Sequence, residues 1–512
     1  MNHLPVLPIL IPLAAGALLL LAHERSASFK RALAGIALLA LTLAVGAALI
    51  EADSGQRMVY QLGNWPSNIG IVLVLDRLSA LMLVLATVLG VIALVHAAGG
   101  DDQRQPHFHA LLMFQLMGLN GAFLTGDLFN LFVFFEVLLI ASYALLVHAA
   151  DGERLRRATH YMVINLTGSA LFLIALGLLF GLVGTLNMAD LARKIALAPV
   201  ENQAIIEVAA LLLMTVFAIK GALLPVYLWL PRTYAAATPA VAALFAIMTK
   251  VGIYAVYRVH SLIFGADAGA LAQLAQPWLL PLGIGTLILA ALGALAAREL
   301  RVLVGYLIVA SAGTLFVAFG VGGQSALNAG LFYLIHSTLV VAALFLLADL
   351  IATHRPRAGD SLRLADYIQR PDVLALVFLI LAVAVTALPP LSGFIAKVAL
   401  LDALAKHPGG AWIWAAVLGS GLLLMVSLAR AGSQLFWRPA PEAFRNAAPV
   451  PAPSLFTVLP IAALTTAILA LSVLADPVLR YTGAAATQLL DTRGYIDDVL
   501  GQVPVERAQP AP

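Results

Sequence analysis

The sequence contains no cysteine and very little charge. Only 11% of its 512 residues are Asp, Glu, Lys or Arg, whereas soluble domains carry about 25%. The missing cysteine excludes disulfides, thioether-linked haem, iron–sulfur clusters and thiolate zinc sites, and we expect no cofactor. The shortage of charge excludes a soluble globular fold, a disordered chain, a coiled coil and a nucleic-acid-binding protein.

Apolar sequence is abundant instead. Hydrophobic residues make up 62% of the chain, and the mean hydropathy is +0.98. A bilayer core about 30 Å thick needs about 20 apolar residues per helix, so the pattern predicts an all-α integral membrane protein of about fourteen transmembrane helices. The candidate runs are 4–22, 31–50, 70–96, 108–126, 128–149, 159–183, 204–230, 238–259, 276–297, 301–321, 325–349, 371–404, 411–436 and 455–475.

We expect one polytopic membrane domain over residues 1–475. A polar tail over residues 476–512 is expected to form an exposed helix or a loose segment. The first apolar run follows Met1-Asn2-His3, which is not a basic n-region. We therefore expect this run to be a retained span and not a cleaved signal peptide.

Lys and Arg in the loops predict the orientation of the chain. The loops after the odd-numbered runs hold about twice as many of these residues as the N-terminus, the loops after the even-numbered runs and the tail together. The smaller group includes Arg57, Arg193, Lys194 and Arg258. Because basic loops stay in the cytoplasm, both termini are predicted to lie on the non-cytoplasmic side.

Five ionisable residues lie inside apolar runs: Glu136, Lys220, Lys250, His336 and Lys397. A charge at the bilayer centre costs about 2.5–3.5 kcal/mol, so these side chains must face the bundle interior and find partners or water, or lose their charge. Burial disfavours the charged form, and a neighbouring opposite charge favours it. A lysine held between these two effects can take up and release a proton. A row of such groups bridged by water is a proton relay.

Two other interpretations compete with a relay. Glu136 and one lysine could form an inert interior ion pair in a purely structural scaffold. One carboxylate cannot neutralise three lysines, however, so we favour the relay. His336 could be a neutral histidine that only satisfies a helix contact.

Three other charged positions have structural interpretations. Arg77 adjoins Asp76 at the start of a run and is expected to be an interface anchor. Asp127 and Asp349 lie at the ends of runs and are expected to be helix caps or loop-facing groups.

Proline interrupts two of the runs that carry a lysine. Pro225 follows Lys220, and Pro389 and Pro390 precede Lys397. Proline frees a helical carbonyl, and irregular backbone at membrane depth is tolerated only where protein or water satisfies it. We therefore expect broken helices in the seventh and twelfth spans.

The two broken spans are five spans apart, which predicts an internal repeat. Residues of about 108–259 and 276–436 would form two five-helix units. Because five is odd, corresponding helices would run in opposite directions through the membrane, as in inverted-repeat transporters. The order of lysine and proline is also reversed between the two breaks.

The residues around the lysines resemble those of a known family. The stretches K-G-A-L-L-P-V-Y-L-W-L-P-R-T-Y-A-A-A-T-P-A-V-A-A-L-F-A-I-M-T-K-V-G-I-Y-A-V-Y-R at 220–258 and L-P-P-L-S-G-F-I-A-K at 388–397 resemble antiporter-like subunits. These subunits occur in respiratory complex I and in Mrp/Pha-type multisubunit monovalent cation/proton antiporters. The sequence T-K-V-G-I-Y-A around Lys250 is most similar to the D subunit of the Mrp/Pha type. The resemblance covers nearly the whole chain.

The resemblance implies fourteen helices with two inverted five-helix repeats. The family's glutamate and three lysines fall on Glu136, Lys220, Lys250 and Lys397. Arg232 stands where relatives often have an acidic residue, and Val341 where many carry a further lysine. The second departure suggests that His336 carries more of the relay.

The resemblance also implies a place and partners. It implies a hetero-oligomer with other hydrophobic subunits, in contact with membrane lipids in a bacterial inner membrane, that exchanges Na⁺ or K⁺ for H⁺. We expect a transporter subunit and not an enzyme. No cage of carboxylates for Na⁺ or K⁺ is evident in the sequence, so the cation and any metal site stay open.

The alternative is a proton-pumping subunit of a complex I-type NADH–quinone oxidoreductase or of a membrane-bound hydrogenase. Lys397 argues against the complex I subunit that has a glutamate there. The short tail argues against the largest subunit, which ends in a long lateral helix.

Overall fold

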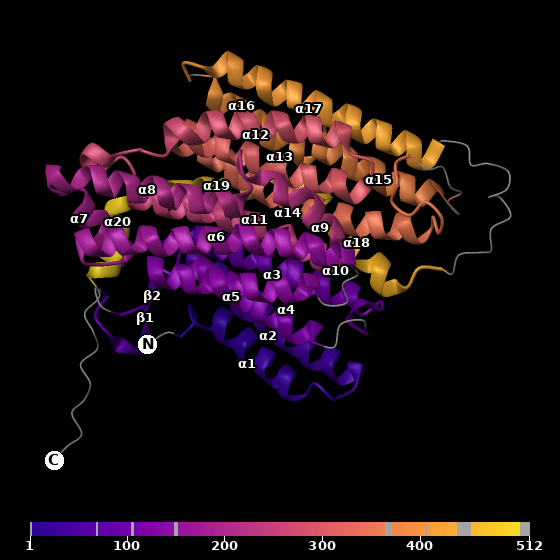
Figure 1. The fold of residues 1–512 in the computed structure, drawn as a ribbon, viewed down its shortest axis with the longest axis horizontal. Coiled ribbons are helices and arrows are strands. Elements are labelled where there is room, and N and C mark those ends of the chain that lie inside the picture. Colours follow the sequence, from indigo (N-terminus) through magenta and orange to yellow (C-terminus); the bar gives the residue numbers. More distant parts are fainter. Residues whose placement is uncertain are drawn as a thin grey trace.

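A computed structural model describes residues 3–67, 70–103, 107–147, 152–363, 368, 371–405, 407–437 and 452–501. Most of these residues lie in helices, and the long helices run along the long axis of the molecule and form one elongated bundle (Figure 1). Backbone groups in hydrocarbon must be satisfied within the chain, which is why apolar runs of this length form helices.

The elements have the following bounds. They are α1 Leu7–Leu21, α2 Ala27–Asp53, β1 Met58–Gln61, η1 Leu62–Asn64, β2 Val72–Leu75, α3 Arg77–Ala97, η2 Asp101–Gln103, α4 Phe108–Leu124, α5 Leu128–Val147, α6 Gly152–Val183, α7 Met188–Ile195, α8 Val200–Gly221, η3 Tyr227–Trp229, α9 Leu230–Ala236, α10 Pro239–Phe245, α11 Met248–Ala255, η4 Val256–His260, η5 Gly269–Leu271, α12 Gln276–Ala296, α13 Leu300–Val321, α14 Gly323–Thr353, α15 Pro371–Thr386, α16 Ser392–Leu404, α17 Gly410–Gly432, η6 Ser433–Trp437, α18 Leu455–Val473, α19 Ala475–Leu490 and α20 Thr492–Leu500.

Among the described residues, eleven helical segments are long and apolar enough to cross a bilayer, and α1, α4 and α15 are shorter apolar helices. The segment Pro239–His260 is entirely buried, and α13 and α14 are nearly so. Outer helices such as α2, α6 and α17 expose large aliphatic side chains instead. The protein is therefore a multi-pass membrane protein, with lipid-facing helices around a buried centre.

Most predicted runs begin and end within a few residues of a helix, but one was wrong over part of its length. Residues 72–75 of the predicted run 70–96 form strand β2, which pairs antiparallel with β1 so that Met58 lies opposite Leu75. Helix α3 begins only at Arg77, where Asp76 and Ser79 form a capping box. Hydropathy alone could not separate this buried apolar strand from a helix.

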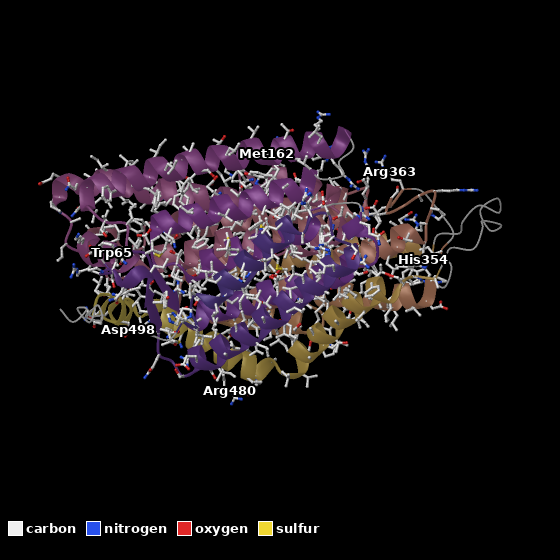
Figure 2. The ribbon with its side chains drawn as sticks, turned by 90° about the horizontal axis from the view of Figure 1, so that it is seen from below. Trp65, Met162, His354, Arg363, Arg480 and Asp498 are labelled. Atoms are coloured by element: carbon white, nitrogen blue, oxygen red, sulfur yellow. The ribbon has the colours of Figure 1, made fainter. Side chains whose placement is uncertain are left out.

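The hairpin lies at one end of the bundle with α7, α20 and the two ends of the described chain (Figure 1). At that end, His3 Nδ1 is 3.0 Å from the Tyr60 hydroxyl. Figure 2 shows Trp65 and Asp498 at this end, and His354 and Arg363 at the opposite one. The two ends of the described chain therefore lie on the same side of the bundle.

The C-terminal segment packs against the bundle. Helix α19 lies on α14 and α3, and α20 lies on α7. Arg57, from the loop before β1, reaches Asp491 at 3.0 Å and Asp498 at 2.9 Å. Partial burial opposes ionisation of Asp491, but hydrogen bonds from Arg57 and from the Gly494 N–H hold the pKa of its carboxyl below the ordinary value. The described tail is thus docked along one face, whereas its composition predicts an exposed helix or a loose segment.

Arg258 does not lie in a loop, so the prediction that it counts among the loop residues was wrong. It sits in the π-helical segment η4, 4% exposed, and its guanidinium is 2.6 Å from the Asp76 carboxylate. The rings of Tyr254 and Tyr495 flank the guanidinium. The pair ties the end of the buried segment Pro239–His260 to the start of α3 and to α20.

Arg77, by contrast, is half-buried and links the start of α3 to α2 and α19. Its guanidinium donates to the Asp53 carbonyl at 2.7 Å, while its backbone N–H donates to Gln488 at 3.0 Å. Asp127 caps α5 by accepting from the Asn130 N–H at 2.8 Å, as expected of a cap. Asp349 pairs with Arg301 at 2.7 Å.

Replacing Arg258 by alanine should destabilise the protein by about 3–5 kcal/mol, because it leaves the Asp76 carboxylate buried without its partner. Thermal unfolding in detergent measures the change. The paired replacement Asp76→Leu with Arg258→Met should restore much of the loss, since an apolar pair has no desolvation cost. A single variant as stable as the original protein would contradict this account.

Candidate functional site

Lys220 lies at a break in the helical path. Helix α8 ends at Gly221, and Ala222 takes the left-handed conformation with φ of 57°. Two side chains bond the backbone around the break: Trp229 Nε1 donates to the Ile219 carbonyl at 3.2 Å, and Thr286 accepts from the Leu224 N–H at 2.8 Å. The chain then continues through η3 into α9. The irregular backbone at this depth is therefore bonded by protein.

The Lys220 ammonium is 5.0 Å from the centre of the Phe135 ring, and the side chain is 5% exposed. Within the described chain, no hydrogen-bond acceptor reaches its Nζ. A cation over an aromatic face gains electrostatic energy. Lys220 is therefore held by a ring, and its buried Nζ has no hydrogen-bond acceptor in the described chain.

Glu136 follows Phe135 on α5 and faces α6. Its carboxylate accepts a hydrogen bond from the Ser169 hydroxyl. Glu136 and Lys220 interact electrostatically, but no ion pair between them falls within 4.0 Å in the described residues. Glu136 and Lys220 therefore do not form the direct ion pair that was the alternative to a relay.

Lys250 is the most deeply buried of the three lysines, at 1% exposed. Its Nζ donates to the Ser311 hydroxyl on α13 at 2.5 Å, and Ser311 donates to the Ile308 carbonyl at 2.7 Å. Gly252, one half-turn further along α11, allows this segment to cross the end of α8. A Cβ there would lie 2.5 Å from the Gly221 nitrogen, so only glycine fits at this crossing.

Polar side chains continue from Lys250 towards α14. Thr314, three residues after Ser311 on the same helix, donates to the Ala310 carbonyl at 3.1 Å and lies near the Tyr333 hydroxyl. The Tyr333 ring lies 6.0 Å from the His336 ring, centre to centre. Sequence reasoning missed Ser311, Thr314 and Tyr333, because neutral hydroxyls in an apolar helix carry no charge to mark them.

His336 joins α14 to the second break. Its Nδ1 is 2.9 Å from the Ser392 hydroxyl, and the ring lies close to the backbone carbonyl of Ala384. The break lies between α15 and α16, with Ala387 left-handed at φ of 60°. A Cβ on Gly393 would collide with the Ala384 carbonyl oxygen and would lie 2.8 Å from His336 Nε2. The histidine thus contacts the interrupted backbone itself.

Lys397 lies on α16 and interacts electrostatically with His336. Its Nζ is 3.0 Å from the position a Cβ would take on Gly421 of α17. Ser420, beside that glycine, is buried, and its hydroxyl has no hydrogen-bond partner in the described chain. Lys397 therefore ends the line of polar groups against an outer helix.

Several other buried polar atoms lack a protein partner among the described residues. They include Thr249 Oγ1 beside Lys250, Gln115 Oε1 on α4 and Thr87 Oγ1 on α3. Such atoms are where internal water binds in proteins. Val341, at the position where the resemblance expects a further lysine, is buried and apolar. No cluster of three or more His, Asp or Glu side chains that could hold a metal occurs in the described part of the chain.

A family model for the transmembrane region of NADH:quinone oxidoreductase and Mrp antiporter subunits matches residues 125–426, which is more than half of the chain. The chain belongs to this family. The matched region starts at Thr125 and ends within α17. It includes Glu136, the three buried lysines and both helix breaks.

Curated relatives span the chain almost completely. The probable D subunit of a K⁺/H⁺ antiporter of Rhizobium meliloti is 39% identical, covering 98% of each chain. The D subunit of a Na⁺/H⁺ antiporter of Alkalihalophilus pseudofirmus is 37% identical, covering 98% of this chain and 100% of the relative.

Solved structures share the fold. A chain of the Mrp complex from Dietzia sp. is 28% identical with a TM-score of 0.87, covering 98% of this chain and 100% of that one. A chain of respiratory complex I from Thermus thermophilus is 24% identical with a TM-score of 0.77, covering 95% of this chain and 99% of that one. The latter likeness concerns the fold alone.

Replacing Gly393 by alanine should destabilise the protein by about 1–3 kcal/mol, because the new Cβ meets the rigid Ala384 carbonyl. Gly419→Ala on α17 is the matched control, since nothing lies within 4 Å of its Cβ position. Thermal unfolding of both variants in the same detergent measures the difference. Equal stability of the two variants would show that Gly393 does not lie against the Ala384 carbonyl.

Proposed function

We propose that this protein is the proton-translocating, D-type subunit of a multisubunit Na⁺ or K⁺/proton antiporter. The observation that carries the proposal is the line of polar side chains from Lys250 through Ser311, Thr314 and Tyr333 to His336. The relatives in Rhizobium meliloti and Alkalihalophilus pseudofirmus are both named as D subunits of antiporters, which supports the same conclusion, and their names cover both cations.

In this mechanism, protons reach Lys220 and Lys250 through internal water. Glu136 sets the charge state of Lys220 electrostatically, since Lys220 has no direct acceptor in the described chain. A proton leaving Lys250 passes to Ser311, whose hydroxyl can accept one proton while donating another. Internal water then carries the proton past Tyr333 and His336 to Lys397, because no direct hydrogen bond joins the described residues Ser311, Tyr333 and His336. Each change of lysine charge shifts the charge state of the next group.

The membrane domain spans residues 1–475, with the tail docked on it. Fourteen crossings result when α8 with α9, and α15 with α16, are each counted as one broken span. The two breaks share one backbone pattern, which supports an inverted repeat over about 108–259 and 276–436. Leu223 N–H donates to the Ala218 carbonyl at 2.9 Å, and Leu388 N–H donates to the Val383 carbonyl at 3.1 Å, each beside a left-handed alanine.

The complex lies in a bacterial inner membrane, with both termini of this subunit on the non-cytoplasmic side. The excess of basic residues at the end of the bundle opposite the termini supports this orientation. Other hydrophobic subunits and lipids surround it. The exposed aliphatic faces of α2 and α17 are suited to both.

A second candidate is a proton-pumping subunit powered by electron transfer, because complex I and an archaeal membrane-bound sulfane sulfur reductase contain chains of this fold. The genes beside the coding sequence distinguish the two. Small antiporter subunits favour the first candidate, whereas flavin and iron–sulfur subunits favour the second.

Replacing Glu136 by alanine should abolish antiport while the complex still assembles, because Lys220 loses the carboxylate that sets its charge. Fluorescence of a pH-sensitive dye in everted vesicles carrying the whole complex reports proton movement on addition of Na⁺ or K⁺. Glu201→Ala is the control, since Glu201 is exposed in the first turn of α8. Normal antiport by the Glu136 variant would refute its role.

The double variant Glu136→Gln with Lys220→Met tests the scaffold interpretation in the same vesicles. A scaffold in which the charges merely pair would keep transport when both charges are removed together.

Tyr333→Phe should slow antiport by about tenfold or more, because phenylalanine keeps the shape and removes the hydroxyl on the path of the proton. Tyr306→Phe, which removes a hydroxyl on α13 away from this line, should leave the rate unchanged. Initial rates in everted vesicles compare the two. Equal rates would mean that protons do not pass Tyr333.

A further inference from the structure

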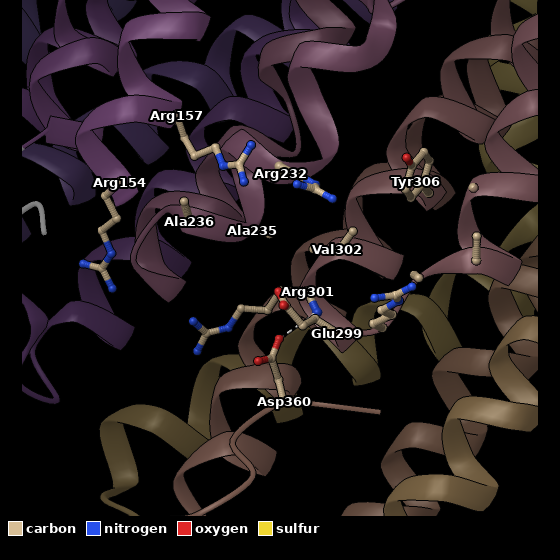
Figure 3. A pocket seen from close by; sticks show the side chains of 14 residues that line it. Arg154, Arg157, Arg232, Ala235, Ala236, Glu299, Arg301, Val302, Tyr306 and Asp360 are labelled. Carbon is tan, nitrogen blue, oxygen red and sulfur yellow. Dashed lines mark hydrogen bonds between the residues drawn. The ribbon is translucent and has the colours of Figure 1, made fainter. Parts of the chain in front are cut away.

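A cavity of about 730 Å³ lies at the end of the bundle that carries the basic loops. Arginines from four separate parts of the chain line it: Arg154 and Arg157 on α6, Arg232 on α9, Arg298 in the loop before α13, and Arg301 on α13. Figure 3 shows Arg154, Arg157 and Arg232 on one wall and Arg301 facing them from the other. The relay described above uses none of these residues.

The carboxylates among the lining residues are fewer than the arginines. They are Glu299 and Asp360. Asp360 also accepts from the Arg301 backbone N–H at 3.1 Å (Figure 3), and the Arg301 guanidinium is paired outside the lining with Asp349 at 2.7 Å. Arginines therefore outnumber carboxylates in the lining, and Arg154, Arg157 and Glu299 also interact with partners of their own. A cavity lined mainly by charges of one sign attracts ions of the opposite sign.

The position of the cavity indicates what kind of anion reaches it. It lies between the last residues of α12 and the first residues of α13, beside the start of α6. Apolar helices end at the level of the lipid headgroups. Basic pockets between helices at this level bind anionic headgroups. Small residues such as Gly293, Ala235 and Ala236 line the remainder and leave room for a group of that size.

We propose that this cavity is a binding site for a phosphate-bearing anion. Guanidinium groups form paired hydrogen bonds to phosphate oxygens, which a single ammonium cannot do. A phospholipid headgroup and a free phosphate compound present the same chemistry to these arginines. The site stands independently of the proton relay, because it shares no residue with it.

The test uses the purified, delipidated complex in neutral detergent. Native mass spectrometry and thermal stability are followed while phosphatidylglycerol, phosphatidylcholine or inorganic phosphate is added. The variant combines Arg154→Gln, Arg157→Gln and Arg232→Gln, with Arg232→Gln alone as a milder form should the triple variant fail to assemble. Arg156→Gln is the matched control, because Arg156 is exposed on the same helix and does not line the cavity.

The original complex and the Arg156 control should bind phosphatidylglycerol, and the triple variant should bind it about tenfold or more weakly. Stabilisation by phosphatidylglycerol alone identifies a lipid headgroup as the ligand. Equal stabilisation by inorganic phosphate identifies a free phosphate compound.

Two kinds of result would overturn the proposal. One is binding that does not depend on the lining arginines: either the triple variant binds phosphatidylglycerol as tightly as the original complex, or the Arg156 control loses as much phosphatidylglycerol affinity as the triple variant. The other is loss of a neighbouring subunit from the triple variant with anion binding unchanged, which would make the arginines a contact for an acidic protein surface.

Discussion

The cost of placing a charged group in hydrocarbon determines how the centre of this protein is built. Three lysines and a glutamate lie inside helices that cross the apolar part of the molecule, and each is placed differently. Lys250 has a hydroxyl and Lys220 an aromatic ring, while Glu136 accepts from Ser169. Contacts with neutral groups leave a lysine free to change its charge, which a tight ion pair would prevent. None of these contacts is an ion pair between a lysine and a carboxylate.

The two interrupted helices follow from the same constraint on the backbone. Each ends in a left-handed alanine, and its freed polar groups find partners on neighbouring helices. Gly252 and Gly393 let other segments come close to these ends, where any larger residue would collide with backbone. As a result, Lys220 and Lys250 lie on segments that cross, and His336 contacts the second break directly. Close packing at the breaks therefore also positions these ionisable side chains.

A second kind of buried charge serves a different purpose. Arg258 and Asp76 are fully paired and flanked by two tyrosine rings. Arg258 lies two turns beyond Lys250 on the same helical path, so the pair fixes this segment against α3 and α20. The protein thus combines a buried ion pair near one end with central lysines that, among the described residues, form no ion pair. The difference lies in whether a carboxylate is within contact distance.

The amino-acid sequence alone predicts a helical membrane protein, the places of most of its helices, and the ionisable residues in apolar surroundings. These follow from local composition and from the high cost of charge in lipid, which needs no knowledge of neighbours. The packing of the helices was needed to show that Arg258 is interior, that residues 72–75 form a strand, and that Ser311, Thr314 and Tyr333 lie between Lys250 and His336. These depend on contacts between residues far apart in the chain, and a hydroxyl or a short apolar strand looks the same in sequence whether or not it has such a contact.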